Sequence, residues 1–195
     1  MFAKLCTLFV LAFTLSQPVE ASLINMGSWY EFSWNELDAI PTTTTNCDAV
    51  SPFCPGPPAG AVFAPLPPWT FTAPVGAYLI VTDAFLAGDI FLVYDFGVLL
   101  GSTSLVGFDY DYPYSCDIDP NPCYADPLMS SGIWFLGPGS HSITIDVDTN
   151  PFWGGIGYLR VDAPEPATAI LVGAGVFAIW LTRRRAAQSR PRSTQ

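Results

Sequence analysis

Ser142-Ile143-Thr144-Ile145-Asp146-Val147 is the stretch that decides the fold class of this chain. Apolar and polar residues alternate along it, and successive side chains of a β-strand point to opposite faces of a sheet. The pattern therefore predicts a strand that turns Ile143, Ile145 and Val147 into a core and its polar residues outward. Strands with one buried and one solvated face are typical of antiparallel sheets.

Aromatic and β-branched runs of similar length, separated by Pro and Gly, extend from this stretch towards both ends of the chain. The expected strands are residues 29–34, 69–72, 77–83, 89–94, 98–104, 132–136, 141–147 and 157–162. Asp95-Phe96-Gly97 is expected to be the tight turn of one hairpin, and Gly137-Pro138-Gly139 the turn of a second. Because helix signals are nearly absent, seven or eight short strands predict an all-β domain over residues 22–162, an antiparallel β-sandwich or jelly roll.

The N-terminus has the features of a signal peptide. The single base Lys4 precedes an apolar stretch at residues 5–15, and small residues stand at the −3 and −1 positions of a cleavage site, Val19 and Ala21. We expect a signal peptide over residues 1–21, cleaved between Ala21 and Ser22. The rest of the chain would then be exported.

The C-terminus combines three features in order. A short motif is followed by an uncharged run at about residues 167–182 and then by three bases; the motif is Pro164, Glu165, Pro166, Ala167 and Thr168, and the bases are Arg183, Arg184 and Arg185. As a helix the run rises about 24 Å, so it predicts a short single transmembrane helix. The arginines and residues 186–195 form a basic tail expected on the cytoplasmic side. The alternative, a buried core helix, fits poorly with a charge-free run beside three arginines.

This C-terminal arrangement resembles the PEP-CTERM sorting signal of exported proteins from Gram-negative bacteria that make extracellular polymer. The resemblance covers residues 163–185 and implies that an exosortase, a membrane enzyme like a cysteine transpeptidase, processes the tail near Pro-Glu-Pro. It further implies a stay in the inner membrane during sorting and then a place at the cell surface or in the extracellular matrix. A single-pass anchor that is never cut is the alternative. Residues 85–103 and 140–145 also resemble strands of secreted PEP-CTERM β-sandwich proteins, a likeness that carries no known activity.

The charges are segregated along the chain. Between residues 22 and 163 the single base Arg160 stands against fifteen acids, which gives a formal charge of −14 with His141 neutral. Nucleic-acid binding rests on Lys and Arg contacts, so we expect no nucleic-acid partner. Such a charge suits solubility outside the cell or attraction of divalent cations.

Four cysteines remain after the leader, in two pairs of equal spacing: Cys47 with Cys54, and Cys116 with Cys123. An even number of cysteines in an exported chain predicts disulfides, and pairing within each loop is the simplest of three connectivities. Zinc is the competing hypothesis. Six residues between the cysteines are wide for a zinc knuckle.

An acidic segment follows the third of these cysteines. Asp117, Asp119 and Asn121 alternate as in the first half of a calcium loop. Pro122 replaces the glycine at the sixth position and Leu128 the glutamate at the twelfth, so the segment is not an EF-hand. Calcium bound to these residues is one hypothesis and a solvated acidic loop is the other. No other cofactor is expected.

Tyr110, Tyr112 and Tyr114 alternate with Asp109 and Asp111 in a predicted loop. Exposed aromatic rings stack on sugar rings, and neighbouring carboxylates accept hydrogen bonds from sugar hydroxyls. These tyrosines are therefore candidate contacts to an exopolysaccharide. The competing interpretation places them in the core of a Pro-rich sandwich.

The sequence offers no assembled catalytic set. His141 is the single histidine, and on a strand its neighbours Ser140 and Ser142 point to the opposite face. We therefore expect a non-enzymatic structural protein of the cell surface or extracellular matrix. A carbohydrate-binding module is the second hypothesis, and a secreted hydrolase is the third.

Overall fold

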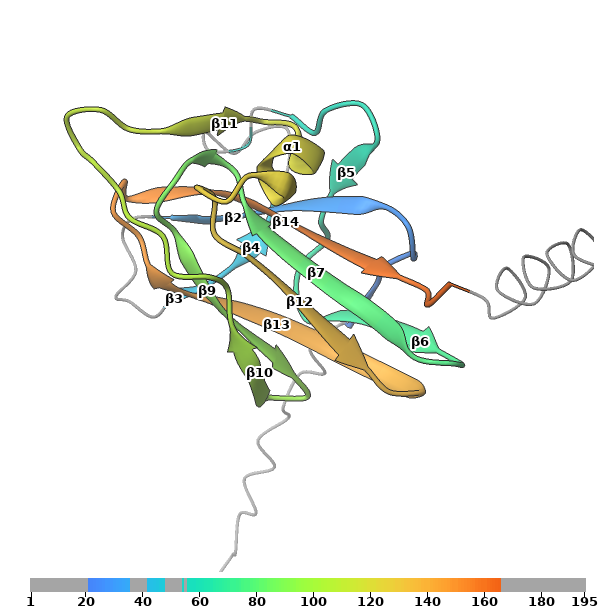
Figure 1. The fold of residues 1–195 in the computed structure, drawn as a ribbon. Helices are drawn as coiled ribbons and strands as arrows, with labels where there is room; N and C mark the ends of the chain where they lie inside the picture. Colours follow the sequence, from blue (N-terminus) through green and yellow to red (C-terminus); the bar gives the residue numbers. More distant parts are fainter. Residues whose placement is uncertain (1–20, 36–41, 48–53, 55, 166–195) are drawn as a thin grey trace, which may run out of the picture.

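β13 (Gly139–Thr149) contains the alternating stretch, and Ile143, Ile145 and Val147 are fully buried as predicted. The computed structural model describes residues 21–35, 42–47, 54 and 56–165. In this part the chain forms two six-stranded sheets packed face to face, so the predicted all-β sandwich is confirmed (Figure 1).

The two sheets are built from strands far apart in sequence. The first has the order β1 (Ser22–Leu23), β6 (Trp69–Ala73), β13, β9 (Ile90–Asp95) and β10 (Val98–Ser102), and β3 (Thr42–Thr43) also pairs with β13. The second has the order β12 (Ser131–Leu136), β7 (Ala77–Asp83), β14 (Gly154–Asp162), β2 (Trp29–Asn35) and β4 (Thr45–Asn46), and β5 (Ala61–Phe63) also pairs with β2. All pairs are antiparallel except β1 with β6 and β2 with β5.

The two predicted hairpins have different outcomes. β9 and β10 form a hairpin with Val98 opposite Asp95, and Phe96 and Gly97 in its turn both have positive φ. Positive φ at both central residues is what a tight hairpin turn requires. The second hairpin prediction is wrong, because β12 pairs with β7 in one sheet and β13 pairs with β6 and β9 in the other. The Gly137–Pro138 link therefore carries the chain from one layer to the other.

Aromatic side chains fill the space between the sheets. Phe91 of β9 meets Phe32 and Trp34 of β2 edge to face, with ring centroids 5.5 and 5.2 Å apart. Burial of one such ring stabilises a domain by about 2 kcal/mol. Gly155 and Gly157 leave room for the two β2 rings, because a Cβ there would lie 2.7 Å from Trp34 and 2.6 Å from Phe32.

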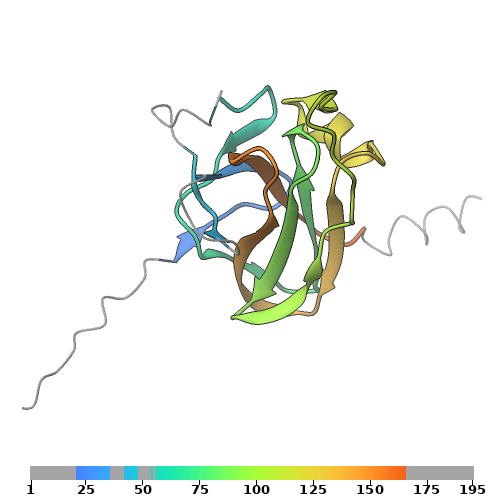
Figure 2. The ribbon, with the colours of Figure 1, turned by 90° about the vertical axis from the view of Figure 1, so that its left-hand side faces the viewer.

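The outer face of the second sheet is covered by a second apolar cluster. Trp29, Ile80, Ile156 and Tyr158 are buried there. The cover consists of α1 (Pro120–Ala125), β8 (Phe85–Leu86) and β11 (Ser115–Asp117), and Ala61 and Phe63 of β5, at the edge of the sheet, pack against the same cluster. Figure 2 shows α1, β11 and β5 together on this side of the sandwich. These short elements were not predicted, because each is too short to show a periodic pattern.

Candidate functional site

Both predicted disulfides are present. Cys47 is bonded to Cys54, and Cys116 to Cys123. Local pairing is therefore confirmed, and the zinc hypothesis is wrong because bonded sulfurs are not thiolate ligands. Each bond fastens part of the cover over the second apolar cluster, where Cys47, Cys54 and Cys123 are buried.

Glu31 lies fully buried beneath the first disulfide. Its carboxylate accepts a hydrogen bond of 2.7 Å from the Tyr158 hydroxyl, and it lies 3.3 Å from the sulfur of Cys47. Burial raises the pKa of Glu31, and the hydrogen bond from Tyr158 opposes that rise. Burial and the neighbouring Glu31 in turn raise the pKa of Tyr158. Glu31, Cys47 and Cys54 lie close enough together to hold a metal ion. The two cysteines are bonded to each other, so neither offers a free thiolate as a ligand.

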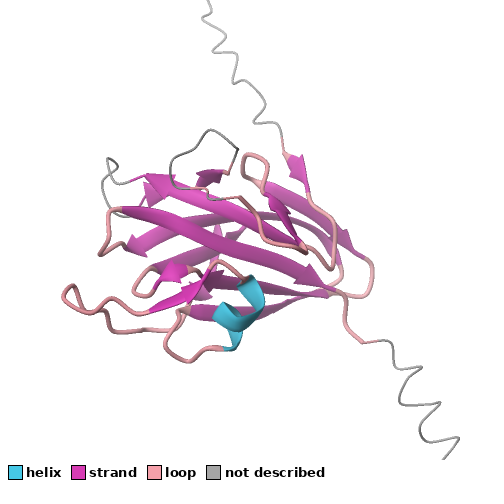
Figure 3. Cartoon of the chain, turned by 90° about the horizontal axis from the view of Figure 1, so that it is seen from above, coloured by secondary structure: helices cyan, strands magenta, loops and turns pink. Residues whose placement is uncertain are grey.

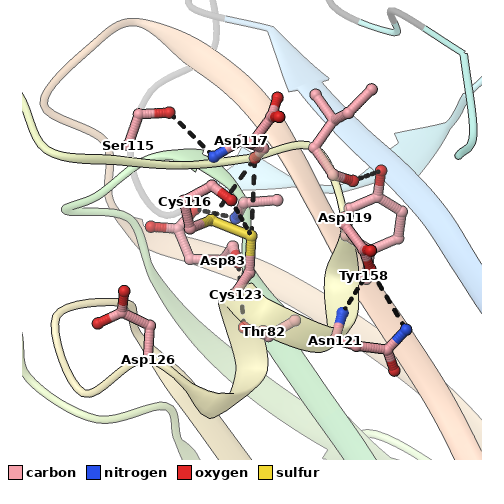
Figure 4. The surroundings of a disulfide bond; sticks show 12 residues. Thr82, Asp83, Ser115, Cys116, Asp117, Asp119, Asn121, Cys123, Asp126 and Tyr158 are labelled. Carbon is pink, nitrogen blue, oxygen red and sulfur yellow. Dashed lines mark hydrogen bonds between the residues drawn. A yellow bond between two sulfur atoms is a disulfide. The ribbon is translucent and has the colours of Figure 1, made fainter.

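The residues of the predicted calcium loop lie around the second disulfide (Figure 4). Asp119 is the N-cap of α1, because its Oδ1 accepts from the Asn121 backbone N–H at 3.0 Å. Asn121 Oδ1 accepts from the indole N–H of Trp29 at 3.0 Å. Asp117 points away from both residues in Figure 4. Two of the three predicted ligands thus hold the cover in place, and calcium binding stays a prediction.

The predicted tyrosine loop lies between β10 and β11 and is open to solvent. Tyr110, Tyr112 and Tyr114 are 64, 83 and 41 % exposed, so the interpretation as core residues is wrong. Tyr114 donates a hydrogen bond to Asp126. That bond raises the pKa of the Tyr114 hydroxyl and lowers the pKa of the Asp126 carboxyl.

Other aromatic side chains from two loops join these tyrosines. Phe108, Tyr110 and Phe152 form a triad of edge-to-face contacts with ring centroids 5.1, 5.6 and 6.3 Å apart. Trp153 follows in the turn between β13 and β14 and is 68 % exposed. We call this set the aromatic end; it consists of Phe108, Tyr110, Tyr112, Tyr114, Phe152 and Trp153. The contribution of residues 152–153 was not predicted, because sequence alone does not bring the two loops together.

A groove of about 300 Å³ opens beside Tyr114. Its walls come from the two ends of the tyrosine loop, from the segment after α1 and from the loop after β8; they are Ala87, Leu105, Val106, Gly107, Tyr114, Pro127 and Leu128. Leu105 and Leu128 are 84 and 54 % exposed. The groove is thus lined mainly by apolar side chains, with one hydrogen-bonded hydroxyl at its margin.

The aromatic end and the sorting tail lie at opposite ends of β14. Trp153 immediately precedes the first residue of β14, and the chain leaves the last residue, Asp162, for Pro164 and Glu165. A strand of this length spans about 30 Å. In Figure 3 the long loop protrudes at the left while the chain leaves β14 at the right.

His141 takes part in a polar network that the sequence did not reveal. Its Nδ1 lies 2.8 Å from Asp95 Oδ2, and its Nε2 lies 2.9 Å from the Gly137 carbonyl. The ring stacks on Phe71 with centroids 5.1 Å apart. A carboxylate and a histidine are therefore paired, but the second ring nitrogen faces a backbone carbonyl and not a serine hydroxyl.

Asp83 and Asp89 form a buried carboxyl pair where β7 ends and β9 begins. They are 0 and 3 % exposed. Asp83 Oδ1 accepts from the N–H of Ala84 at 2.8 Å, and its Oδ2 accepts from the N–H groups of Gly88 and Asp89, each at 3.2 Å. Asp83 thereby ties the loop around β8 into a closed turn. Among the described side chains, Asp89 Oδ1 and the Trp34 indole nitrogen are buried without a hydrogen-bond partner.

The pKa values of both carboxyl groups lie above the ordinary range of an aspartic acid. Burial raises the pKa of Asp89 to about 8, partly opposed by its interaction with Asp83. Burial and the neighbouring Asp89 raise the pKa of Asp83, while the three backbone N–H groups oppose the rise. Two buried carboxylates so close together repel each other, so the pair is expected to keep one proton at neutral pH. The spacing of Asp83 and Asp89 around a Gly-containing turn was the only signal of this pair in the sequence.

Residues 162–185 match the PEP-CTERM protein-sorting motif, which confirms the resemblance seen in the sequence. The motif directs a protein through exosortase to the cell surface or the extracellular space. No curated protein and no solved structure matches the chain. Within the described residues, none of the helices is long and apolar enough to cross a bilayer.

Several predictions on the chain ends lie outside the described residues. They concern the leader at 1–20 and the motif from Pro166 onward, including the transmembrane helix at 167–182 and the three arginines. At the predicted cleavage site, Ala21 is a coil residue and Ser22 is the first residue of β1. Pro164 is half-buried and Glu165 is exposed.

Proposed function

We propose that this exported protein is a non-catalytic, matrix-associated protein of the cell surface that binds extracellular polysaccharide through its aromatic end. The observation that carries the proposal is the position of the aromatic end. Six aromatic side chains from two loops gather at the end of β14 that lies away from the sorting tail. A chain sorted or held by its tail would therefore present these rings outward.

The chemistry of the aromatic end suits sugar rings. Tyr112 and Trp153 present large exposed faces, 83 and 68 % exposed, to which the apolar faces of pyranose rings can stack. Asp109 and Asp111 lie in the same loop and are exposed, so their free oxygens can accept hydrogen bonds from sugar hydroxyls. Phe108 and Phe152 pack against the Tyr110 ring and hold it in a fixed position, which lowers the conformational entropy lost when a sugar binds.

The charge of the domain limits the class of polysaccharide that it can bind. Between residues 22 and 163 only Arg160 is basic, and its guanidinium lies over Trp29, 4.5 Å from the ring centroid, and is bonded to Asp162. An acidic polymer would find no free cation in the described part of the domain and would be repelled by the excess of carboxylates. We therefore infer a neutral polysaccharide or one that carries amino groups.

Support for a non-catalytic role comes from the acids and the histidine. Hydrolysis of a glycosidic bond requires two carboxyl groups that reach the substrate. Asp83 and Asp89 are close together but buried, so a sugar cannot reach them. Both nitrogens of His141 are engaged with Asp95 and Gly137.

The proposal is tested by affinity electrophoresis of the full chain, in detergent, through gels that contain the host's own exopolysaccharide. We expect Trp153→Ala to weaken binding about tenfold, which corresponds to about 1.4 kcal/mol. Phe96→Ala is the matched control, because Phe96 is 67 % exposed, has positive φ like Trp153 and lies in the turn between β9 and β10. Unretarded migration of the unaltered chain, or equal losses in the two variants, would contradict the proposal.

A further inference from the structure

β12 is an edge strand of the second sheet. It pairs with β7 on one side, and none of the strands in the described ranges pairs with it on the other. Its register with β7 runs without a bulge from Ser131, opposite Thr82, to Leu136, opposite Ala77. The strand contains no charged residue and no proline, although the exported part carries a formal charge of −14.

The other edges of the sandwich are protected. Edge strands usually avoid pairing with another chain through bulges, charged residues, prolines or short length. β10 has a bulge between Leu99 and Gly101, and β1, β3, β4 and β5 have only two or three residues each. Within the described part, β12 is thus the one long edge without such protection.

The hydrogen bonds at the start of β12 show which backbone groups face the free edge. The N–H of Asp83 donates to the carbonyl of Ser130 at 2.8 Å, so residue 130 bonds towards β7. Ser131 bonds the other way: its carbonyl accepts from the N–H of Ser104 at 2.8 Å, and its own N–H donates to the Ser104 hydroxyl at 3.0 Å. Because the direction alternates along a strand, Ile133 and Phe135 point their N–H and C=O groups outward from the edge.

The side chains of the same two residues are exposed on the outer face of the sheet. Ile133 and Phe135 are 53 and 58 % exposed. Phe135 lies next to Tyr78 of β7, with ring centroids 5.3 Å apart, and Tyr78 is itself 39 % exposed. An apolar strip therefore borders an open row of backbone donors and acceptors, which is the surface that an added strand uses.

We propose that β12 pairs antiparallel with β12 of a second copy of this chain, about a two-fold axis at Trp134. In this register Ile133 lies opposite the partner's Phe135, and Phe135 lies opposite the partner's Ile133. Each of the two pairs exchanges two backbone hydrogen bonds, so the four outward groups of one copy satisfy the four of the other. The two sheets then continue into one.

A second copy fits this edge because the edge is self-complementary. The outward groups are placed symmetrically on either side of Trp134, as an interface with two-fold symmetry requires. The uncharged strand also brings no acidic side chain of its own into a contact between two strongly acidic domains. The aromatic end belongs to other loops, so pairing through β12 leaves it free to bind polymer.

The first test is the mass of the full chain in detergent by sedimentation equilibrium, with the detergent density-matched. We expect a dimer, and we expect Ile133→Lys to halve the protein mass. Leu99→Lys on β10 is the control, because Leu99 is also 53 % exposed on an edge strand but lies beside the bulge. A monomer for the unaltered chain, or a dimer that only Leu99→Lys disrupts, overturns the proposal.

The second test reports the register. Cα atoms of a hydrogen-bonded antiparallel pair lie about 5.5 Å apart, within the range that a disulfide spans. A mixture of an Ile133→Cys chain with a Phe135→Cys chain is therefore expected to give a covalent heterodimer on mild oxidation, seen on a non-reducing gel. Either chain alone is expected to stay largely unlinked, because equal positions are two residues out of register. Absence of the heterodimer, or equal linking of the Ile133→Cys chain with itself, overturns the proposed pairing.

Discussion

Replacement of Asp89 by Asn tests whether the buried carboxyl pair makes the domain less stable as the pH rises. Burial raises the pKa of Asp89 from 3.8 to about 8 in the folded state, so between these values the folded chain holds a proton that the unfolded chain has released. The free energy of unfolding therefore falls with rising pH by about 1.4 kcal/mol per unit across this window. From pH 5 to pH 8 the expected loss from Asp89 is about 3–4 kcal/mol.

The Asp89→Asn variant removes this titration and keeps the shape. An amide N–H can donate to Asp83 as the protonated acid does, and no second negative charge forms at high pH. The assay is urea unfolding of both proteins at half-unit steps from pH 5 to pH 8, followed by tryptophan fluorescence. Glu31, whose pKa is also raised, contributes the same slope to both proteins. Because Asp89 also raises the pKa of Asp83, the difference between the two curves reports the titration of the Asp83–Asp89 pair. Parallel curves would refute the reasoning.

Two further changes test other parts of the fold. Serine at both Cys47 and Cys54 is expected to lower the free energy of unfolding by about 2–3 kcal/mol, because a bond that closes a loop of seven residues restricts the unfolded chain; an unchanged urea midpoint would contradict this. Gly157→Ala is expected to cost about 1–3 kcal/mol, because the added Cβ would lie 2.6 Å from the Phe32 ring. Gly137→Ala is its control, since nothing lies within 4 Å of a Cβ there, and equal thermal midpoints for the two variants would argue against close packing at β14.

Local patterns in the sequence predicted most of the strands. Alternation placed Ile143, Ile145 and Val147 in the core, and the tight-turn candidate Asp95-Phe96-Gly97 correctly predicted the hairpin of β9 and β10. The same reasoning failed at Gly137, where a similar turn passes between sheets. A short Gly-rich link is compatible with both paths, and only the partners of β12 and β13 decide between them.

The candidate site was predictable only in part. The exposed tyrosines were suggested by their alternation with acids, whereas Phe152 and Trp153 come to the same end through the turn between β13 and β14. The pairing of Glu31 with Tyr158 joins residues 127 positions apart. Such contacts depend on sheet order, which local sequence does not encode.

The sequence by itself determined the sorting motif that directs this protein to the cell surface or the extracellular space, its strand-rich fold class and its acidic charge, because motif, alternation and composition are local properties. It favoured local pairing of the four cysteines over the other two connectivities, since the shortest loops are the easiest to close, and the structure confirms that pairing. The tertiary structure decided that Asp83 and Asp89 share a buried site, that β12 is left as an open edge, and that the aromatic end lies opposite the tail. The physical reason is that burial and strand pairing depend on contacts between segments that are distant in the sequence. Such contacts stabilise the protein only once the whole sandwich has assembled.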